Sequence, residues 1–297
     1  MYYFVIVLAV FCFTAQFAFT KSYEKTVSPT LHTTLIMVAV TNVVGALLFL
    51  LVGGFQVQVS PFSLFWATAL AAVMIPYFVI GVKVLSLGSL AVYSMFMMLG
   101  GMLVPFFYGV LFLKEELTLG RVAGTVLLTV FIVLQALWTK PEENQGATKG
   151  KKYLFFLLCL LIFFLNGMTG VIAKAHEMHP LAVDEGSFSV LACSITAAGS
   201  LLLLIFGGRK TRAAAKETLR PAPVLVMALL GMAAYTGNFL HLKAAAFVPA
   251  SVQFPLVSGG VIVLSALASK FIFKEAVSKK EWISVAGAFL STVLFAF

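Results

Sequence analysis

The stretches KVLSLGSLAVYSMFMMLGGMLVPFFYGVLFLKEEL (Lys83–Leu117) and KAAAFVPASVQFPLVSGGVIVLSALASKFIFKEAV (Lys243–Val277) are the strongest indication of how this chain is organised. Each begins with lysine, continues through an apolar segment of the same length and closes on Lys-Glu. The two align without a gap, so that Gly100 falls on Gly260. A constant offset of Lys, Gly and Lys-Glu across apolar segments indicates an internal duplication.

The composition is that of a chain embedded in lipid. Of its 297 residues, 61% are hydrophobic and 10% are charged, and the mean hydropathy is +1.06, whereas globular chains average about 25% charged residues. A transmembrane helix needs about 20 apolar residues. We expect ten spans, at Tyr2–Thr20, Leu31–Val52, Pro61–Val82, Ser89–Leu113, Leu119–Trp138, Tyr153–Ala173, Ser187–Phe206, Ala222–Leu242, Pro249–Phe273 and Glu281–Phe297. The first of these is too long for a signal peptide and lacks a basic segment before it.

The spans form two halves. The polar stretch from Lys140 to Lys152 separates them, so we expect a first five-span repeat at 1–140, a linker at 141–152 and a second repeat at 153–297. Because five is odd, the second half enters the membrane from the opposite side. The sequence therefore predicts an all-α integral membrane protein built from two inverted five-helix repeats. Inverted repeats characterise secondary transporters, whose substrate site lies near the midplane between the halves.

The paired motifs also resemble a known family. An aliphatic-Lys dipeptide (Val82-Lys83 and Leu242-Lys243), a small-residue turn, an apolar helix with Pro or Gly and a terminal Lys-Glu occur twice. In this architecture they are similar to the drug/metabolite transporter superfamily, in its ten-span EamA-type branch. The resemblance implies a carrier of small metabolites, amino acids, sugars or drugs with a central cavity. The chain departs from the family pattern because Pro105 lies deeper in its span and Pro255 lies earlier.

The basic residues are distributed unevenly between the loops. The net charge is +9, and the loops after odd-numbered spans hold sixteen lysines and arginines against four in the others. Positive-inside logic places the odd-numbered loops in the cytoplasm and both termini outside, whereas the family resemblance implies cytoplasmic termini. We expect a multi-pass plasma-membrane protein, in a bacterial inner membrane, that functions as a monomer. The bilayer is its partner, and nucleic acid is excluded because the chain has no soluble basic face with stacking aromatics.

Few polar side chains lie inside the predicted spans. The eleven acidic residues all fall at span ends or in loops, so the midplane carboxylate that a proton-coupled exporter of cations would use is missing. Each polar residue in a span could simply join two helices by a hydrogen bond. As a set they could line a polar cavity, and the candidate substrate-binding residues are Tyr77, Tyr93, Ser94, Asn166, Tyr235, Asn238, Gln253 and Ser258.

A second set of residues could open and close such a cavity. The two lysines could either extend to the lipid headgroups or gate each face, and the prolines and glycines could either serve helix packing or act as hinges. The candidate gating residues are Lys83, Lys243, Gly100, Pro105, Pro255 and Gly260.

The chain shows no motif of an enzyme, a metal site or a bound cofactor. Its sequence contains no phosphate-binding loop and no nucleophile elbow. His176 and His179 are too close together on a loop for a dedicated metal site. We therefore expect a secondary transporter that moves a small polar metabolite, an amino acid or related anionic or zwitterionic solute, by alternating access. The alternatives are a broad-range drug/metabolite exporter and a channel or non-transporting membrane scaffold.

Overall fold

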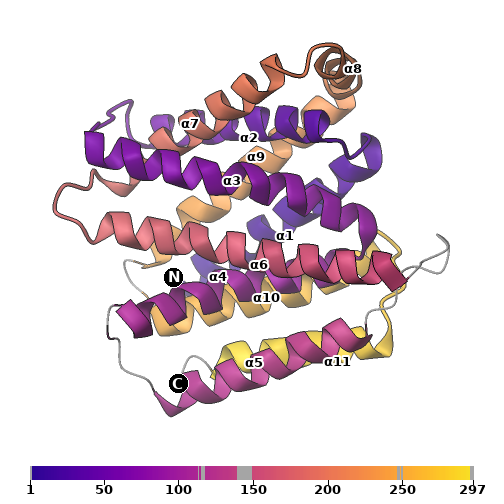
Figure 1. Ribbon diagram of the computed structural model, residues 1–297. Helices are drawn as coiled ribbons and strands as arrows, with labels where there is room; N and C mark the ends of the chain where they lie inside the picture. Colours follow the sequence, from indigo (N-terminus) through magenta and orange to yellow (C-terminus); the bar gives the residue numbers. More distant parts are fainter. Residues whose placement is uncertain are drawn as a thin grey trace.

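The computed structural model describes residues 2–112, 114, 118–138, 149–245, 248 and 250–294, and all the regular structure in this part of the chain is helical. Most of the predicted linker, residues 141–148, lies outside these ranges. Figure 1 shows the long helices packed side by side in one bundle. They are α1 (Tyr2–Thr26), α2 (Leu31–Val52), α3 (Pro61–Leu87), α4 (Leu90–Phe112), α5 (Leu119–Trp138), α6 (Lys149–Glu177), α7 (Glu185–Ile205), α9 (Pro221–Ala245), α10 (Ala250–Phe271) and α11 (Lys279–Leu294), with the short helix α8 (Arg209–Thr218).

Seven of the described helices are long and apolar enough to cross a membrane, namely α1, α2, α3, α4, α6, α7 and α9. Shorter apolar stretches occur in α5 and α10, at Leu119–Phe131 and Leu256–Phe271. A hydrocarbon core satisfies no backbone polar group, so helices suit such segments because they pair their own N–H and C=O groups. The chain is an all-α, multi-pass membrane protein.

Local sequence explains where several helices begin. Ser60 caps α3 by accepting a hydrogen bond from the Ser63 backbone N–H, and Pro61 occupies the first helical position, where no N–H partner is needed. Thr30 and Thr33 form a capping box at the start of α2, and Asp184 caps α7. These caps satisfy donors that an uncapped helix end would leave without partners.

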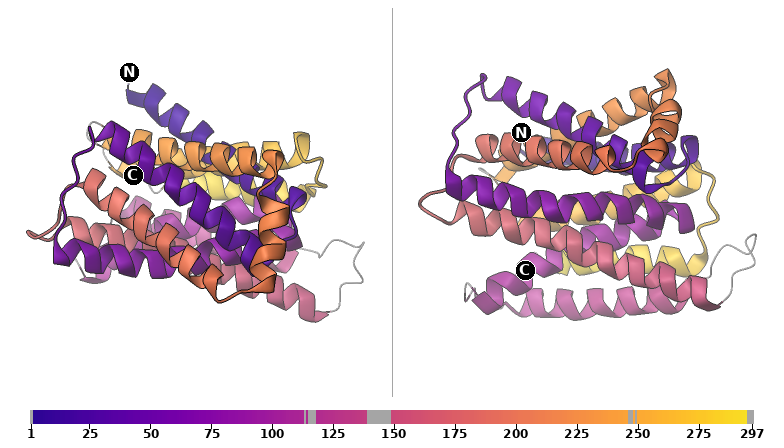
Figure 2. Two further views of the ribbon diagram at one scale, coloured as in Figure 1. Left: turned by 90° about the horizontal axis from the view of Figure 1, so that it is seen from above. Right: turned by 45° about the horizontal axis from the view of Figure 1, so that its top comes forward.

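The helix α8 corrects one expectation. We expected only a loop between the spans Ser187–Phe206 and Ala222–Leu242, but ten residues of this connection, Arg209–Thr218, form a helix that packs against α2. Alanine, lysine and arginine are all strong helix formers, and Ala214 and Thr218 bury one face at a spacing of four residues. The turned views in Figure 2 show α8 (orange) crossing one end of the bundle. We call this the α8 end; α1 begins and α11 ends at the opposite end.

Contacts between helices mostly join the first five helices to the later ones. The most extensive pairs are α1 with α9, α2 with α7, α4 with α6, α5 with α11, α3 with α6 and α4 with α10. Contacts among α1 to α5 themselves are much fewer. The two halves of the chain therefore interlock in space instead of forming separate lobes.

Helix starts repeat at a fixed distance along the chain. Helices α3, α4 and α5 begin at Pro61, Leu90 and Leu119, and α9, α10 and α11 begin at Pro221, Ala250 and Lys279. The separation between each helix start and its counterpart is the same in all three pairs, and it equals the separation between Gly100 and Gly260.

Candidate functional site: a cavity between five helices

A cavity of about 150 Å³ lies in the middle of the bundle. Helices α1, α3, α4, α6 and α9 surround it, and each contributes residues near its own midpoint. The lining residues are Phe13, Gln16, Phe17, Met74, Tyr77, Phe78, Met97, Met98, Asn166, Thr169, Ala234, Tyr235 and Asn238. The cavity therefore combines aromatic and thioether walls with amide and hydroxyl groups, the usual composition of a small-molecule site.

Hydrogen bonds hold the polar lining groups in place. The Asn166 amide donates to the Met97 carbonyl oxygen at 2.6 Å and joins α6 to α4. The Asn238 amide donates to the Ala234 carbonyl oxygen at 2.9 Å. The Tyr235 hydroxyl donates to Asn42 Oδ1 at 2.7 Å. These groups are thus fixed before any solute enters, and pre-organisation lowers the entropy cost of binding.

The described lining contains no aspartate, glutamate, lysine, arginine or histidine. A solute that carries a net charge would therefore lose its hydration without gaining an ionic partner in this conformation. Uncharged amides and hydroxyls can still pair with hydrogen-bonding groups on a polar solute.

Four of the eight predicted binding residues line the cavity: Tyr77, Asn166, Tyr235 and Asn238. The other four are buried elsewhere. The Tyr93 ring packs edge-on against Phe17 at 5.5 Å between centroids, and the Ser94 hydroxyl donates to the Ala91 carbonyl within its own helix.

The remaining two residues lie in α10. Gln253 donates to the backbone carbonyl of His241 at 2.5 Å, and its own Oε1 is buried without a hydrogen-bond partner. Ser258 is buried outside the cavity lining. Sequence reasoning missed the contribution of α1, although Gln16 is an amide in the middle of an apolar span and was the available signal.

The glycines predicted as hinges occupy close contacts between helices. A Cβ atom at Gly100 would lie 2.1 Å from the backbone oxygen of Phe163 in α6, and one at Gly260 would lie 2.9 Å from Val10 Cγ1 in α1. Pro105 lies against Gly170 of α6. Close approach of two backbones is a packing role of glycine. The Pro255 side chain lies outside the described part of the chain.

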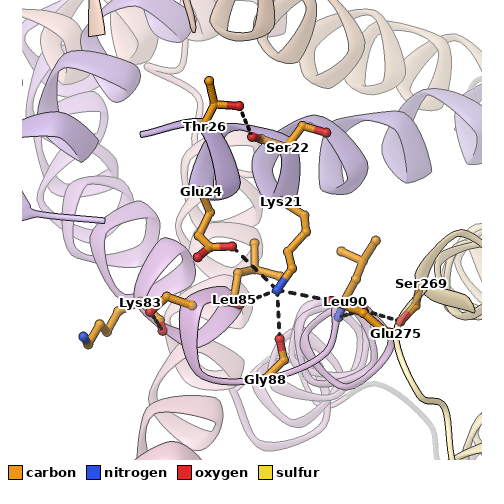
Figure 3. Close-up of polar contacts among 11 residues, drawn as sticks. Lys21, Ser22, Glu24, Thr26, Lys83, Leu85, Gly88, Leu90, Ser269 and Glu275 are labelled. Carbon is orange, nitrogen blue, oxygen red and sulfur yellow. Dashed lines mark hydrogen bonds and ion pairs between the residues drawn. The ribbon is translucent and has the colours of Figure 1, made fainter. Parts of the chain in front are cut away.

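Both lysines of the predicted gate are exposed. Lys243 lies over the Phe239 ring at 5.5 Å, and Figure 3 shows Lys83 pointing away from its polar neighbours. These positions suit side chains that extend toward the headgroup region.

A different lysine, Lys21, is buried at the α8 end of α1, where it is 6% exposed. Its ammonium donates to the carbonyl oxygens of Leu85 at 2.6 Å and Gly88 at 3.2 Å. Glu275 Oε1 lies 3.2 Å away and Glu24 Oε2 lies 3.6 Å away (Figure 3). We call this group the Lys21 cluster.

Glu275 connects the Lys21 cluster to two further helices. Its Oε2 accepts the backbone N–H of Leu90 at 3.0 Å, at the start of α4, and a short hydrogen bond from the Ser269 hydroxyl. Its side chain is 9% exposed. A buried carboxylate needs this many partners because an unpaired charge in lipid or protein is costly.

His176 and His179, near the opposite end, pack against aromatic side chains. His176 Nε2 lies 2.8 Å from the Ser63 hydroxyl and its ring stacks on Phe188. His179 stacks on Phe62 at 4.1 Å between centroids. In the described residues no three His, Cys, Asp or Glu side chains gather closely enough to hold a metal ion.

Comparison with known proteins extends the description of the fold. No protein-family model matches the chain, and no curated protein matches it. Among solved structures 27 chains match. One, described only as "Crystal structure of protein", has a TM-score of 0.60 and 19% sequence identity, and the match covers 98% of this chain and 94% of that one. The likeness is one of fold. A protein of nearly the same length thus shares this helix arrangement.

Proposed function

We propose that the protein is a ten-span secondary transporter with two inverted repeats, and that a small polar solute crosses the membrane through the central cavity. The pairing of cavity residues carries the proposal. Gln16 and Thr169 occupy the same place relative to Lys21 and Lys174 near the ends of α1 and α6. Phe78 and Asn238 occupy the same place in α3 and α9, at equal distances from Pro61 and Pro221. Residues at equivalent positions of the two halves thus line the same cavity.

Helix packing supports the inverted arrangement. Counted along each half, the five long helices are α1 to α5 in the first half and α6, α7, α9, α10 and α11 in the second. Three extensive contacts join helices at the same place in this order: α2 with α7, α4 with α10 and α5 with α11. The others come in matching pairs: α1 meets α9 as α6 meets α3, and α4 meets α6 as α10 meets α1. A twofold relation between the halves produces this pattern, and alternating access follows when such halves exchange conformations. The resemblance to EamA-type carriers agrees with it.

The cavity restricts the solute. Its volume of about 150 Å³ fits a small metabolite, and its neutral lining favours uncharged or internally balanced polar groups over a lipophilic cation. An amino acid or a related zwitterion meets this requirement better than a strongly anionic solute. The α8 end carries the basic residues and is therefore the cytoplasmic side, in a cell membrane.

One observation favours a broad-range exporter as the second candidate. Met74, Met97 and Met98 all line the cavity, and flexible thioethers adapt to ligands of varied shape. Met95 and Met102 are buried away from it. A substrate range that includes unrelated hydrophobic compounds would support this second function.

Counterflow in proteoliposomes tests the proposal. Purified protein would first be screened with a metabolite library by thermal shift, because a ligand stabilises the state it binds. Proteoliposomes preloaded with the hit should then accumulate labelled solute transiently, since a carrier exchanges one molecule for another and a channel does not. Asn238→Ala should abolish the accumulation, and Ser258→Ala, a buried change outside the cavity, should preserve it. Equilibration without overshoot would indicate a channel and overturn the carrier.

A further inference from the structure

The helix α8 lies where the chain turns between two apolar spans. The span Glu185–Ile205 ends shortly before α8, and the span Pro221–His241 begins shortly after it. Figure 2 shows that the axis of α8 crosses the ends of the long helices instead of running along them. Because the long helices run through the bilayer, α8 lies along the membrane surface, at the depth of the lipid headgroups.

One face of α8 is held against the bundle. Ala214 and Thr218 are buried, and α8 packs against α2. The Thr211 hydroxyl also donates a hydrogen bond to the Leu204 carbonyl oxygen, at the end of α7, at 2.7 Å. These contacts fix the rotation of α8 about its axis and therefore determine which side chains point outward.

The outward face of α8 is basic. Arg209, Arg212 and Lys216 follow one another at spacings of three and four residues, which places them on one side of the helix, and all three are exposed. The carboxylate of Glu217 already accepts the backbone N–H of Ser28 at 2.6 Å. No ion pair joins any of the three cations to a residue that the structure describes.

This arrangement indicates an anionic partner with an apolar part. Like charges three and four residues apart on a helix repel one another and destabilise it, and a negatively charged partner removes that cost. At the two ends of α8, Phe206 is 81% exposed and Leu219 is 60% exposed. A soluble acidic partner would leave these apolar side chains in water, whereas a lipid covers them with its acyl chains while its phosphate meets the cations.

We propose that the outward face of α8 is a binding surface for the phosphate headgroups of anionic lipids in the adjacent leaflet. Arg209 and Arg212 each offer two parallel N–H donors to phosphate oxygens, and Lys216 adds a compact positive charge. Phe206 and Leu219 contact the acyl chains. The inference goes beyond the proposed function, because it concerns the membrane itself and holds whether or not the protein carries a solute.

Tryptophan quenching by brominated lipids measures the selectivity of this surface. In a background with Trp66, Trp138 and Trp282 replaced by phenylalanine, Leu219→Trp places one reporter at the end of α8. The protein would be reconstituted in mixtures of phosphatidylcholine and phosphatidylglycerol, with bromine on the chains of one lipid or the other. Phosphatidylglycerol should bind beside the reporter at least about fivefold more tightly than phosphatidylcholine, the factor that one surface cation provides. This ratio should fall as salt screens the charges.

Two double variants separate a site on α8 from the general positive charge of this end. Arg212→Gln with Lys216→Gln removes two cations and keeps strong helix formers at both positions, so the ratio should fall toward one. Lys279→Gln with Lys280→Gln is the matched control. It removes two exposed lysines from the same end of the bundle, at the start of α11, and should leave the ratio unchanged. An equal loss in both double variants would overturn a site on α8.

Thermal unfolding separates lost lipid binding from lost structure. In phosphatidylcholine alone, Arg212→Gln with Lys216→Gln should melt no lower than the unsubstituted protein, because a repelling pair is gone. In phosphatidylglycerol the unsubstituted protein should melt higher than this variant, because a ligand stabilises the state it binds. A lower Tm of the variant in both lipids would show that the two cations hold the fold, and would overturn the proposal.

The remaining outcomes identify a different occupant. Inorganic phosphate should displace phosphatidylglycerol from the reporter no more than sodium chloride does at the same ionic strength. Stronger displacement by phosphate would assign the surface to a soluble phosphate compound and overturn the lipid. A ratio of one in the unsubstituted protein would also overturn the lipid and would leave an acidic soluble partner as the occupant.

Discussion

The contact at Gly100 permits a quantitative test of how α4 and α6 pack. In Gly100→Ala the new Cβ atom would lie 2.1 Å from the Phe163 backbone oxygen and 2.7 Å from its carbonyl carbon. The obstacle is backbone, so the two helices must separate, and overpacking costs about 3 kcal/mol at the upper end of its usual range. Alanine recovers about 1 kcal/mol through its helix propensity. We therefore expect a net loss of about 2 kcal/mol.

The assay is thermal unfolding in detergent, followed by tryptophan fluorescence at one fixed scan rate because membrane proteins often unfold irreversibly. A loss of about 2 kcal/mol corresponds to a decrease in Tm of roughly 4–8 °C for a chain of this size class. Gly199→Ala is the control, since its Cβ would meet only the flexible end of Ile75 at 3.2 Å. With the same gain in helix propensity and little overpacking, it should leave Tm unchanged or raise it slightly. If Gly100→Ala has the same Tm as Gly199→Ala, the close approach of α4 to α6 is wrong and the hinge interpretation gains support.

Three other predictions follow from single contacts. Tyr235→Phe removes the donor to the buried Asn42 Oδ1, so it should lower the free energy of unfolding by about 1–3 kcal/mol; additivity with Asn42→Ala in a double-mutant cycle would refute the coupling. Asp184→Ala should cost about 1 kcal/mol by removing the cap of α7, while Asp184→Asn should keep the cap and lose only the contribution of the charge. Burial opposes ionisation of Asp184, but hydrogen bonds from Ser187 and Gly186 prevail and lower its pKa below the ordinary 3.8. The charge of Asp184 therefore stabilises the fold above pH 3.8, and this contribution should disappear as pH falls through the lowered pKa, as melting curves at stepped pH would show. Lys83→Gln and Lys243→Gln, at exposed positions, should leave counterflow unchanged. Loss of counterflow in either variant would support the interpretation that these lysines gate the cavity.

Much of the helix arrangement could be predicted from the sequence. Long apolar runs bounded by Pro61, Pro221 and charged islands located the ten long helices within a few residues, because a membrane leaves helices as the form for such segments. α1 continues past the predicted Thr20 to Thr26, since Lys21 and Glu24 find partners inside the bundle. α8 was missed because a charged segment with little hydrophobicity gives no span signal, although its alanines favour a helix.

The site was less predictable than the helices. Tyr77, Asn166, Tyr235 and Asn238 were found because a polar group inside an apolar span stands out. Whether such a group faces a cavity or a neighbouring helix depends on rotation about the helix axis. Tyr93 shows this, because it lies inside a predicted span of the repeat and is nevertheless buried outside the cavity lining.

The Lys21 cluster was missed for a related reason. Three of the four partners of Lys21, namely Leu85, Gly88 and Glu275, lie 64 or more positions away in the sequence, and the duplicated motif indicated Lys83 and Lys243 instead. A lysine near the end of an apolar span has the same sequence signature whether it points to lipid headgroups or into the bundle.

The interlocking of the two halves has a consequence for biogenesis. Helices α1 to α5 make few contacts with one another and many with the later helices, so a ribosome that has made only the first half has delivered helices whose partners do not yet exist. Those helices must wait, singly or beside an insertase, until α6 to α11 arrive and assembly becomes favourable. Separately expressed fragments ending near 140 and beginning near 149 should thus survive proteolysis together and be degraded apart.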